Sequence, residues 1–140
     1  MLRALLAFSL LATVATVSAN EQEAETNLRA KIWEGYNQGW AVRTATTAEL
    51  GEEEYRVFLV TLYTGNEYRI LGVGDANVAN IDIVLHDSDG NTIRYDETSE
   101  PQAEFEFEPT GTATYFVVVH ARQLVDANIQ AGVGMAVTYK

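Results

Sequence analysis

The feature that most constrains this chain is a two-residue hydrophobic period that begins near residue 47 and continues to the C-terminus. Short segments with apolar residues at alternate positions are separated by turn signals rich in Gly, Pro, Asn and Asp, at a spacing of roughly 8–12 residues. This pattern predicts short antiparallel strands joined by turns. The predicted strands are 55–63, 67–73, 81–86, 92–96, 103–108, 114–121 and 128–140, and residues near 47 can contribute one more.

Seven or eight such strands predict an all-β fold, namely an antiparallel, jelly-roll-like β-sandwich. The segment Tyr55–Tyr63 (YRVFLVTLY) is apolar on both faces in its middle, which is typical of a central strand. One shared core is expected to bury the following residues: Phe58, Val60, Ile83, Leu85, Phe107, Val117, Val119 and Val137.

A helical period precedes the strands. Leu28, Ile32, Tyr36 and Trp40 recur every four residues within Glu21–Arg43, and Trp33 widens the apolar stripe. We therefore expect residues 20–46 to form an N-terminal amphipathic helix and a linker. The stripe either packs on the β-sandwich or binds a partner, in which case Trp33, Tyr36 and Trp40 are the candidate contact residues, since aromatic side chains are enriched at interface hot spots.

The first 19 residues predict a secretory signal peptide. Arg3 precedes an apolar run from Ala4 to Val17, and Val17-Ser18-Ala19 supplies the small residues of a cleavage site. As a helix the run is roughly 21 Å long, shorter than the ~30 Å hydrocarbon core of a bilayer. The predicted organisation is therefore 1–19 signal peptide, 20–46 helix and linker, and 47–140 β-sandwich, with no transmembrane segment in the mature chain.

Charge and composition exclude several classes of function. The chain carries 20 Asp and Glu against 9 Lys and Arg, a formal net charge of −11. An anionic protein of this kind is a poor partner for nucleic acid, which is itself a polyanion. The chain has no cysteine, which excludes disulfides, zinc–thiolate sites and a cysteine nucleophile.

Motifs of the strand region resemble the bacterial pre-peptidase C-terminal domain over residues 47–140. The segments that carry the resemblance are Ile81-Asp82-Ile83, Asp87-x-Asp89-Gly90 and Phe107-x-Pro109-x-Gly111-Thr112, followed by Tyr115-x-Val117. The chain departs from that family in having an N-terminal helix, no accompanying catalytic domain, and two residues between Thr112 and Tyr115. The resemblance implies a sandwich fold and a non-catalytic role, and it supplies no ligand.

Acidic loops offer a candidate calcium site. Asp87-Ser88-Asp89-Gly90-Asn91 begins like a calcium loop, but Thr98 stands where an EF-hand has its distal glutamate. Asp75, Asp82, Asp87 and Asp89 are the candidate ligands, provided that their loops meet. The alternative is that Asp87–Gly90 is a simple hairpin turn. No other cofactor is expected.

A carboxylate-dependent hydrolase is a further alternative, with a pair such as Asp82 and Glu106, because two carboxylates can share acid and base roles. His86 and His120 lie in predicted strands without a recognisable nucleophile motif. The sequence favours an exported, non-catalytic binding or interaction module of the bacterial envelope, periplasmic or secreted, with a protein or glycan ligand. A calcium-stabilised structural domain is the alternative.

Overall fold

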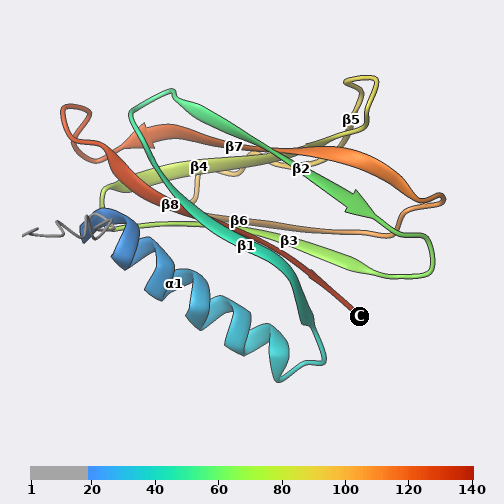
Figure 1. The fold of residues 1–140 in the computed structure, drawn as a ribbon. Coiled ribbons are helices and arrows are strands. Elements are labelled where there is room, and N and C mark those ends of the chain that lie inside the picture. The colour runs from blue at the N-terminus through green and yellow to red at the C-terminus, as the bar shows by residue number, and fades with distance from the viewer. Residues whose placement is uncertain (1–18) are drawn as a thin grey trace, which may run out of the picture.

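A computed structural model describes residues 19–140, and the predicted signal peptide lies outside them except for Ala19. One helix and eight strands follow one another along the chain (Figure 1). The elements are α1 (Ala19–Tyr36), β1 (Ala41–Leu50), β2 (Tyr55–Leu62), β3 (Tyr68–Gly74), β4 (Val78–His86), β5 (Thr92–Asp96), β6 (Gln102–Phe107), β7 (Ala113–Leu124) and β8 (Ala131–Tyr139).

The strands form two four-stranded antiparallel sheets, in the orders β1-β8-β3-β6 and β2-β7-β4-β5. We call them the helix-side sheet and the open sheet. They face each other, and α1 lies against the outside of the helix-side sheet (Figure 1). The expected β-sandwich is confirmed, and it has eight strands.

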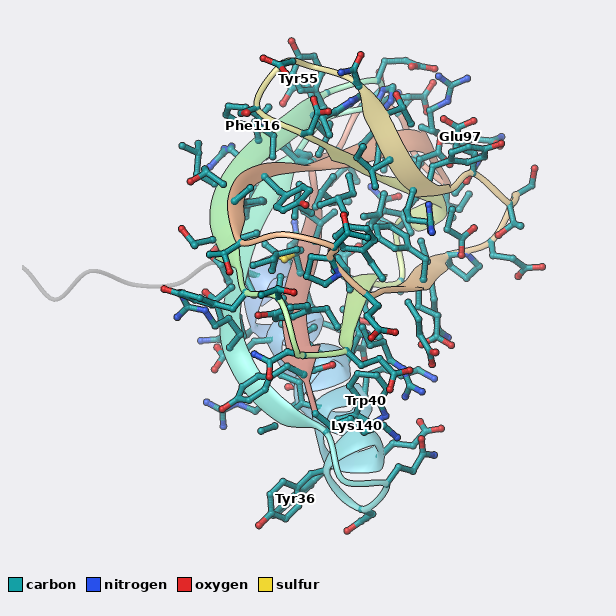
Figure 2. All side chains as sticks on the ribbon, turned by 90° about the vertical axis from the view of Figure 1, so that its right-hand side faces the viewer. Tyr36, Trp40, Tyr55, Glu97, Phe116 and Lys140 are labelled. Carbon is teal, nitrogen blue, oxygen red and sulfur yellow. The ribbon has the colours of Figure 1, made fainter. Side chains whose placement is uncertain are left out.

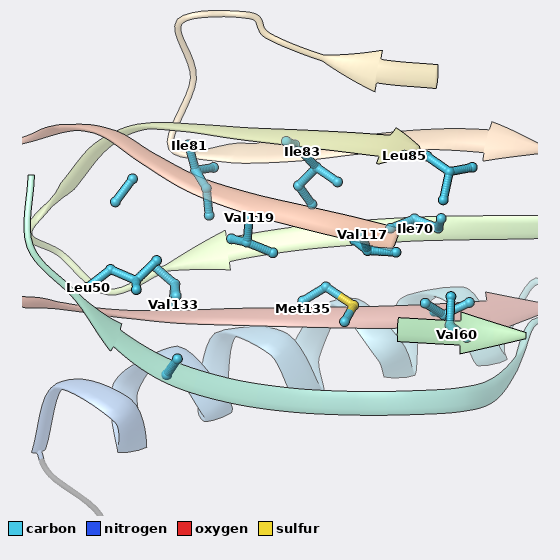
Figure 3. Packing of buried hydrophobic residues seen from close by; sticks show 14 of the residues in the cluster. Leu50, Val60, Ile70, Ile81, Ile83, Leu85, Val117, Val119, Val133 and Met135 are labelled. Carbon is cyan, nitrogen blue, oxygen red and sulfur yellow. The ribbon is translucent and has the colours of Figure 1, made fainter. Parts of the chain in front are cut away.

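The core fills the space between the sheets with aliphatic side chains from both of them (Figure 3). Of the eight predicted core residues, Phe58 is only partly buried, because it lies on edge strand β2. The other seven are buried: Val60, Ile83, Leu85, Phe107, Val117, Val119 and Val137. Two-residue alternation therefore identified the inward face of each strand.

The helix is shorter than the period predicted. It ends at Tyr36, Trp40 N–H donates to Gly35 O, and Gly39 adopts a positive φ of 94° that closes the turn. The segment 41–46, which was expected to be linker, belongs to β1 and pairs with β8. Its alternating Thr and Ala suit a strand, but hydrogen bonding to β8 decides the outcome.

The helix packs on its own domain. Leu28 is buried against Leu71, Val73 and Ala136 of the helix-side sheet, and Ile32 lies partly buried beside them. The sequence left open whether the apolar stripe of the helix packs on the β-sandwich or binds a partner. Leu28 and Ile32 of the stripe pack on the β-sandwich.

The structure corrects the position of β2. The sequence predicted a central strand, but β2 is an edge strand of the open sheet and, within residues 19–140, pairs only with β7. Tyr55, Val57 and Leu59 are exposed although they are apolar. Among residues 19–140, no helix combines the length and the hydrophobicity that spanning a membrane requires.

Candidate binding surface

An apolar band crosses the outward face of the open sheet and includes residues of all four strands. The register places Val57 beside Val118, Val118 beside Val84, and Val84 beside Tyr95. One step along, Leu59 lies beside Phe116, and Phe116 beside His86. Because alternate residues of a strand share a face, these rows form one surface, which we call the open face. Its members are Tyr55, Val57, Leu59, Val84, His86, Tyr95, Phe116, Val118 and His120.

Much of this face is in contact with solvent. Leu59 is 68% exposed and Tyr95 62% exposed, and Phe116 and Val118 are half-buried. Tyr55 and Phe116 lie at one extreme of the molecule, opposite Tyr36 and Trp40 near the end of α1 (Figure 2). Both sheets thus have apolar outer faces, but only the helix-side sheet is covered by α1. Contiguous exposed apolar surface in a protein commonly marks an interaction site.

A polar cluster borders one end of the open face. His120 lies between Tyr55 and Asp82 in the register, and its ring contacts the Tyr55 ring edge-on at 6.2 Å. Its Nε2 lies 3.2 Å from Glu53 Oε2 and 3.1 Å from Glu53 O. Arg122 Nε is 3.5 Å from Asp82 Oδ2. The apolar surface is therefore bordered at this end by two acids, each of which lies beside a basic side chain.

Asp82 is a buried carboxyl whose Oδ1 accepts no hydrogen bond within residues 19–140. Burial raises the pKa of Asp82, and Arg122 opposes that shift by stabilising the charged form. Since Arg122 is half-exposed, its attraction is screened by water. The cost of burying the Asp82 charge is therefore only partly offset by Arg122.

Asp75 performs a structural task. Its Oδ2 accepts a hydrogen bond from Gly132 N–H at 2.8 Å, and its Oδ1 accepts one from Asn77 N–H at 2.9 Å. Asp75 N–H in turn donates to Gly132 O. The carboxylate joins the β3–β4 turn to the start of β8, so its oxygens already have protein donors.

Asp87 organises the β4–β5 hairpin. Its Oδ1 accepts from the backbone N–H groups of Asp89 and Asn91, and its Oδ2 accepts from the Asn91 side-chain amide. These hydrogen bonds, the one from the Asn91 side chain foremost, lower the pKa of Asp87. Gly90 completes the turn with a φ of 84°. This is the hairpin alternative that the sequence left open.

The four candidate calcium ligands do not come together. Asp75 precedes β4 and Asp87 follows it, at opposite ends of a strand that is roughly 30 Å long, and Asp82 lies between them at the rim of the open face. Within residues 19–140, no three His, Asp or Glu side chains are grouped so that they could hold a metal ion.

The proposed hydrolase pair is also separated. Glu106 lies on the outer face of the helix-side sheet, where Arg69 binds it at 2.9 Å, whereas Asp82 lies on the open face. The sandwich core stands between them. Two carboxylates on opposite surfaces do not act on one substrate atom.

The three aromatic residues proposed as partner contacts differ in their exposure to solvent. Trp33 and Tyr36 are 65% and 60% exposed, and their ring centroids are 5.3 Å apart. Trp40 follows the helix and is buried, with the Arg69 guanidinium and the Lys140 ammonium 4.4 and 4.6 Å from its ring centroid. Trp33 and Tyr36 remain available to a partner, and Trp40 is a packing residue.

The open face itself was not predicted from the sequence. The signal was present in YRVFLVTLY, whose outward positions Tyr55, Val57 and Leu59 are as apolar as its inward ones. Such a segment is equally consistent with a buried central strand and with an edge strand that exposes apolar side chains. Only the strand order distinguishes the two.

No protein-family model matches the chain, and no curated protein matches it in sequence. Solved structures do match. The pre-peptidase C-terminal domain of collagenase from Bacillus anthracis is 16% identical, with a TM-score of 0.48, over 69% of this chain and 89% of that domain. Aeromonas hydrophila PliG, a periplasmic lysozyme inhibitor of g-type lysozyme, is 12% identical, with a TM-score of 0.51, over 71% of this chain and 88% of PliG.

The first of these structures is a domain of the family that the sequence motifs resemble. At such low identities a structural likeness concerns the fold alone. This chain therefore has a β-sandwich of the kind found in PliG.

Proposed function

We propose that this protein is an exported, non-catalytic binding module of the bacterial envelope that holds a protein partner on the open face. The observation that carries the proposal is the contrast between the two sheets. The helix-side sheet is covered by Leu28 and Ile32 of α1, whereas Leu59, Tyr95 and their neighbours have no cover from residues 19–140.

The chemistry of the face favours a basic protein over a glycan. Its centre is apolar, its rim carries Glu53 and Asp82 beside His120 and Arg122, and the chain has a net charge of −11. An apolar surface on an acidic protein complements an apolar patch ringed by Lys or Arg. PliG is a periplasmic inhibitor of a lysozyme, so a g-type lysozyme is a reasonable first probe.

The non-catalytic part of the proposal is supported by the positions of the acids. The carboxylates of Asp75 and Asp87 are occupied by backbone donors, and Asp82 and Glu106 lie on opposite faces. A hydrolase activity that is lost on changing one carboxylate, with the fold intact, would contradict it.

The test uses three baits against an envelope extract and against g-type lysozyme: the parent, Leu59→Asp and Val125→Asp. Leu59 lies on the open face, and Val125, 73% exposed, lies in the β7–β8 loop, so the two variants add the same charge at exposed apolar sites. We expect the parent and Val125→Asp to retain the same protein and Leu59→Asp to lose it. Equal retention by Leu59→Asp would show that the open face is not the binding site.

A second candidate surface is the exposed Trp33–Tyr36 pair on α1. Exposed aromatic pairs supply large contact areas with little loss of side-chain entropy. If the partner docks there, Trp33→Ala abolishes capture and Leu59→Asp does not, so the same assay separates the two surfaces.

Export is a separate part of the proposal and rests on residues 1–19. Mass spectrometry of the protein from a Gram-negative periplasm should find Asn20 at the N-terminus. An intact Met1 on a membrane-bound species would contradict export and leave the binding surface untouched.

A further inference from the structure

The open edge of β2 lacks the usual protection against pairing with another strand. The strand contains no Pro or Gly, pairs with β7 without a register shift, and has Arg56 as its only charged residue. Natural edge strands are commonly short, bulged or charged, because a regular apolar edge recruits further strands.

The hydrogen-bond register identifies which backbone groups of β2 are free. Ala121 N–H donates to Glu54 O, and antiparallel pairs alternate, so Arg56, Phe58 and Val60 exchange hydrogen bonds with β7. The N–H and C=O groups of the intervening residues point away from β7. These residues are Tyr55, Val57, Leu59 and Thr61, and within residues 19–140 nothing pairs with them across the edge.

We propose that this edge pairs with the β2 edge of a second copy of the chain. Two antiparallel β2 strands related by a two-fold axis at Phe58 place Tyr55 opposite Thr61, and Val57 opposite Leu59, of the other copy. This register satisfies every free edge group of both strands. It also forms the apolar Val57–Leu59 pair twice on the open face, where cross-strand pairs stabilise a sheet.

The edge is self-complementary in this register, because it brings no like charges together. Arg56 is the only charged residue of β2, and it lies opposite Val60 of the other copy. Glu53 lies outside β2, adopts a positive φ of 66° and pairs with His120, so it takes no part in the register.

Dimerisation of this kind joins two open sheets into one continuous eight-stranded sheet. Tyr55, Val57 and Leu59 then move from the margin of a four-stranded face to the middle of a double one. The inference does not depend on the proposed partner, because it concerns backbone pairing at the edge and is measured without any ligand.

The test is sedimentation equilibrium of the full chain, purified from the periplasm of a Gram-negative host, over a dilution series. We expect twice the mass of one chain at high concentration and dissociation on dilution. Val57→Pro removes an N–H that faces the edge and takes no part in the β7 ladder, and it should weaken the dimer at least about tenfold. Val57→Thr keeps the donor and the β-branched shape, and it should retain the dimer.

A pair of charge variants guards against a change that merely prevents folding. Val57→Lys alone and Leu59→Glu alone should each weaken self-association, since each places a charge opposite an apolar side chain of the other copy. A mixture of the two variants should restore a heterodimer, because the introduced lysine of one variant faces the introduced glutamate of the other, and the native Val57–Leu59 pair remains at the second position. A monomer at all concentrations, or a dimer unaffected by both Val57→Pro and the charge changes, would overturn the proposal.

Discussion

At the scale of single residues, burial decides what the chemically conspicuous side chains do. Trp40 and Asp82 are both buried side chains that carry a polar atom. Trp40 Nε1 and Asp82 Oδ1 each lack a hydrogen-bond partner within residues 19–140. Trp40 gains from its flanking cations, whereas Asp82 gains little from an exposed arginine. One is expected to stabilise the fold and the other to weaken it.

Replacing Trp40 should therefore reduce stability. We expect Trp40→Ala to lower the free energy of unfolding by ~3–5 kcal/mol, because it removes a large buried side chain and leaves a cavity. Trp40→Phe keeps an aromatic ring and should cost clearly less. Urea denaturation measures both variants. A loss of partner binding with unchanged stability would instead make Trp40 a contact residue.

Removing the Asp82 charge should raise stability, and the effect should depend on pH. Burial raises the pKa of Asp82, so the folded chain holds this proton more tightly than the unfolded chain does. The contribution of this proton to the free energy of unfolding is fully present below the pKa of Asp82 in the unfolded chain, near 3.8. It is lost as the pH rises through the higher pKa of Asp82 in the folded chain.

Asp82→Asn should consequently raise Tm at pH 7, and its advantage should shrink near pH 3, where the parent is protonated. Thermal melts of both proteins across this range, with the exposed Asp89→Asn as control, measure the difference. A lower Tm for Asp82→Asn at pH 7 would show that the Arg122 ion pair outweighs desolvation.

At the scale of elements, the docking of α1 depends on small residues in β8. A Cβ added to Gly132 would overlap the backbone of Asn20 at the start of the helix, and Gly134 lies under Leu28. These glycines therefore let the helix approach the helix-side sheet closely. The role of Gly132 and Gly134 is therefore packing.

Gly132→Ala should push the first turn of α1 away from β8, because the obstructing atoms are backbone and have little room to yield. We expect a loss of ~1–3 kcal/mol. Gly111→Ala is the matched control, since nothing lies within 4 Å of its added Cβ. Hydrogen exchange should show faster opening of α1 in Gly132→Ala alone. Equal behaviour of the two variants would contradict close packing at Gly132.

At the scale of the whole molecule, the two faces of the sandwich are unequal. One is covered by the helix, and the other presents apolar side chains beside an unprotected strand edge. The acidic loops at the two ends are held by internal hydrogen bonds. Stability is therefore expected to come from the core and these bonds, and recognition from the open face.

Calcium should accordingly have little effect on the fold. Asp75 and Asp87 accept backbone N–H groups at opposite ends of β4, so neither loop assembles the six to eight oxygens that calcium prefers. We expect Tm to stay the same in millimolar calcium and in chelator. A rise of several degrees with calcium would reinstate a calcium-stabilised domain.

The sequence by itself determined the inward faces of the strands and several of the turns between them. Alternation identified the inward residues, as at Ile83 and Val117, and Asp87-x-Asp89-Gly90 marked a hairpin, because these signals depend on neighbours in the chain. Tertiary structure alone decided that β2 lies at an edge, that Trp40 is buried while Trp33 is exposed, and that Asp75, Asp82 and Asp87 stay apart. The physical reason is that strand order and the covering of faces depend on contacts between distant segments, which a local hydrophobic period does not encode.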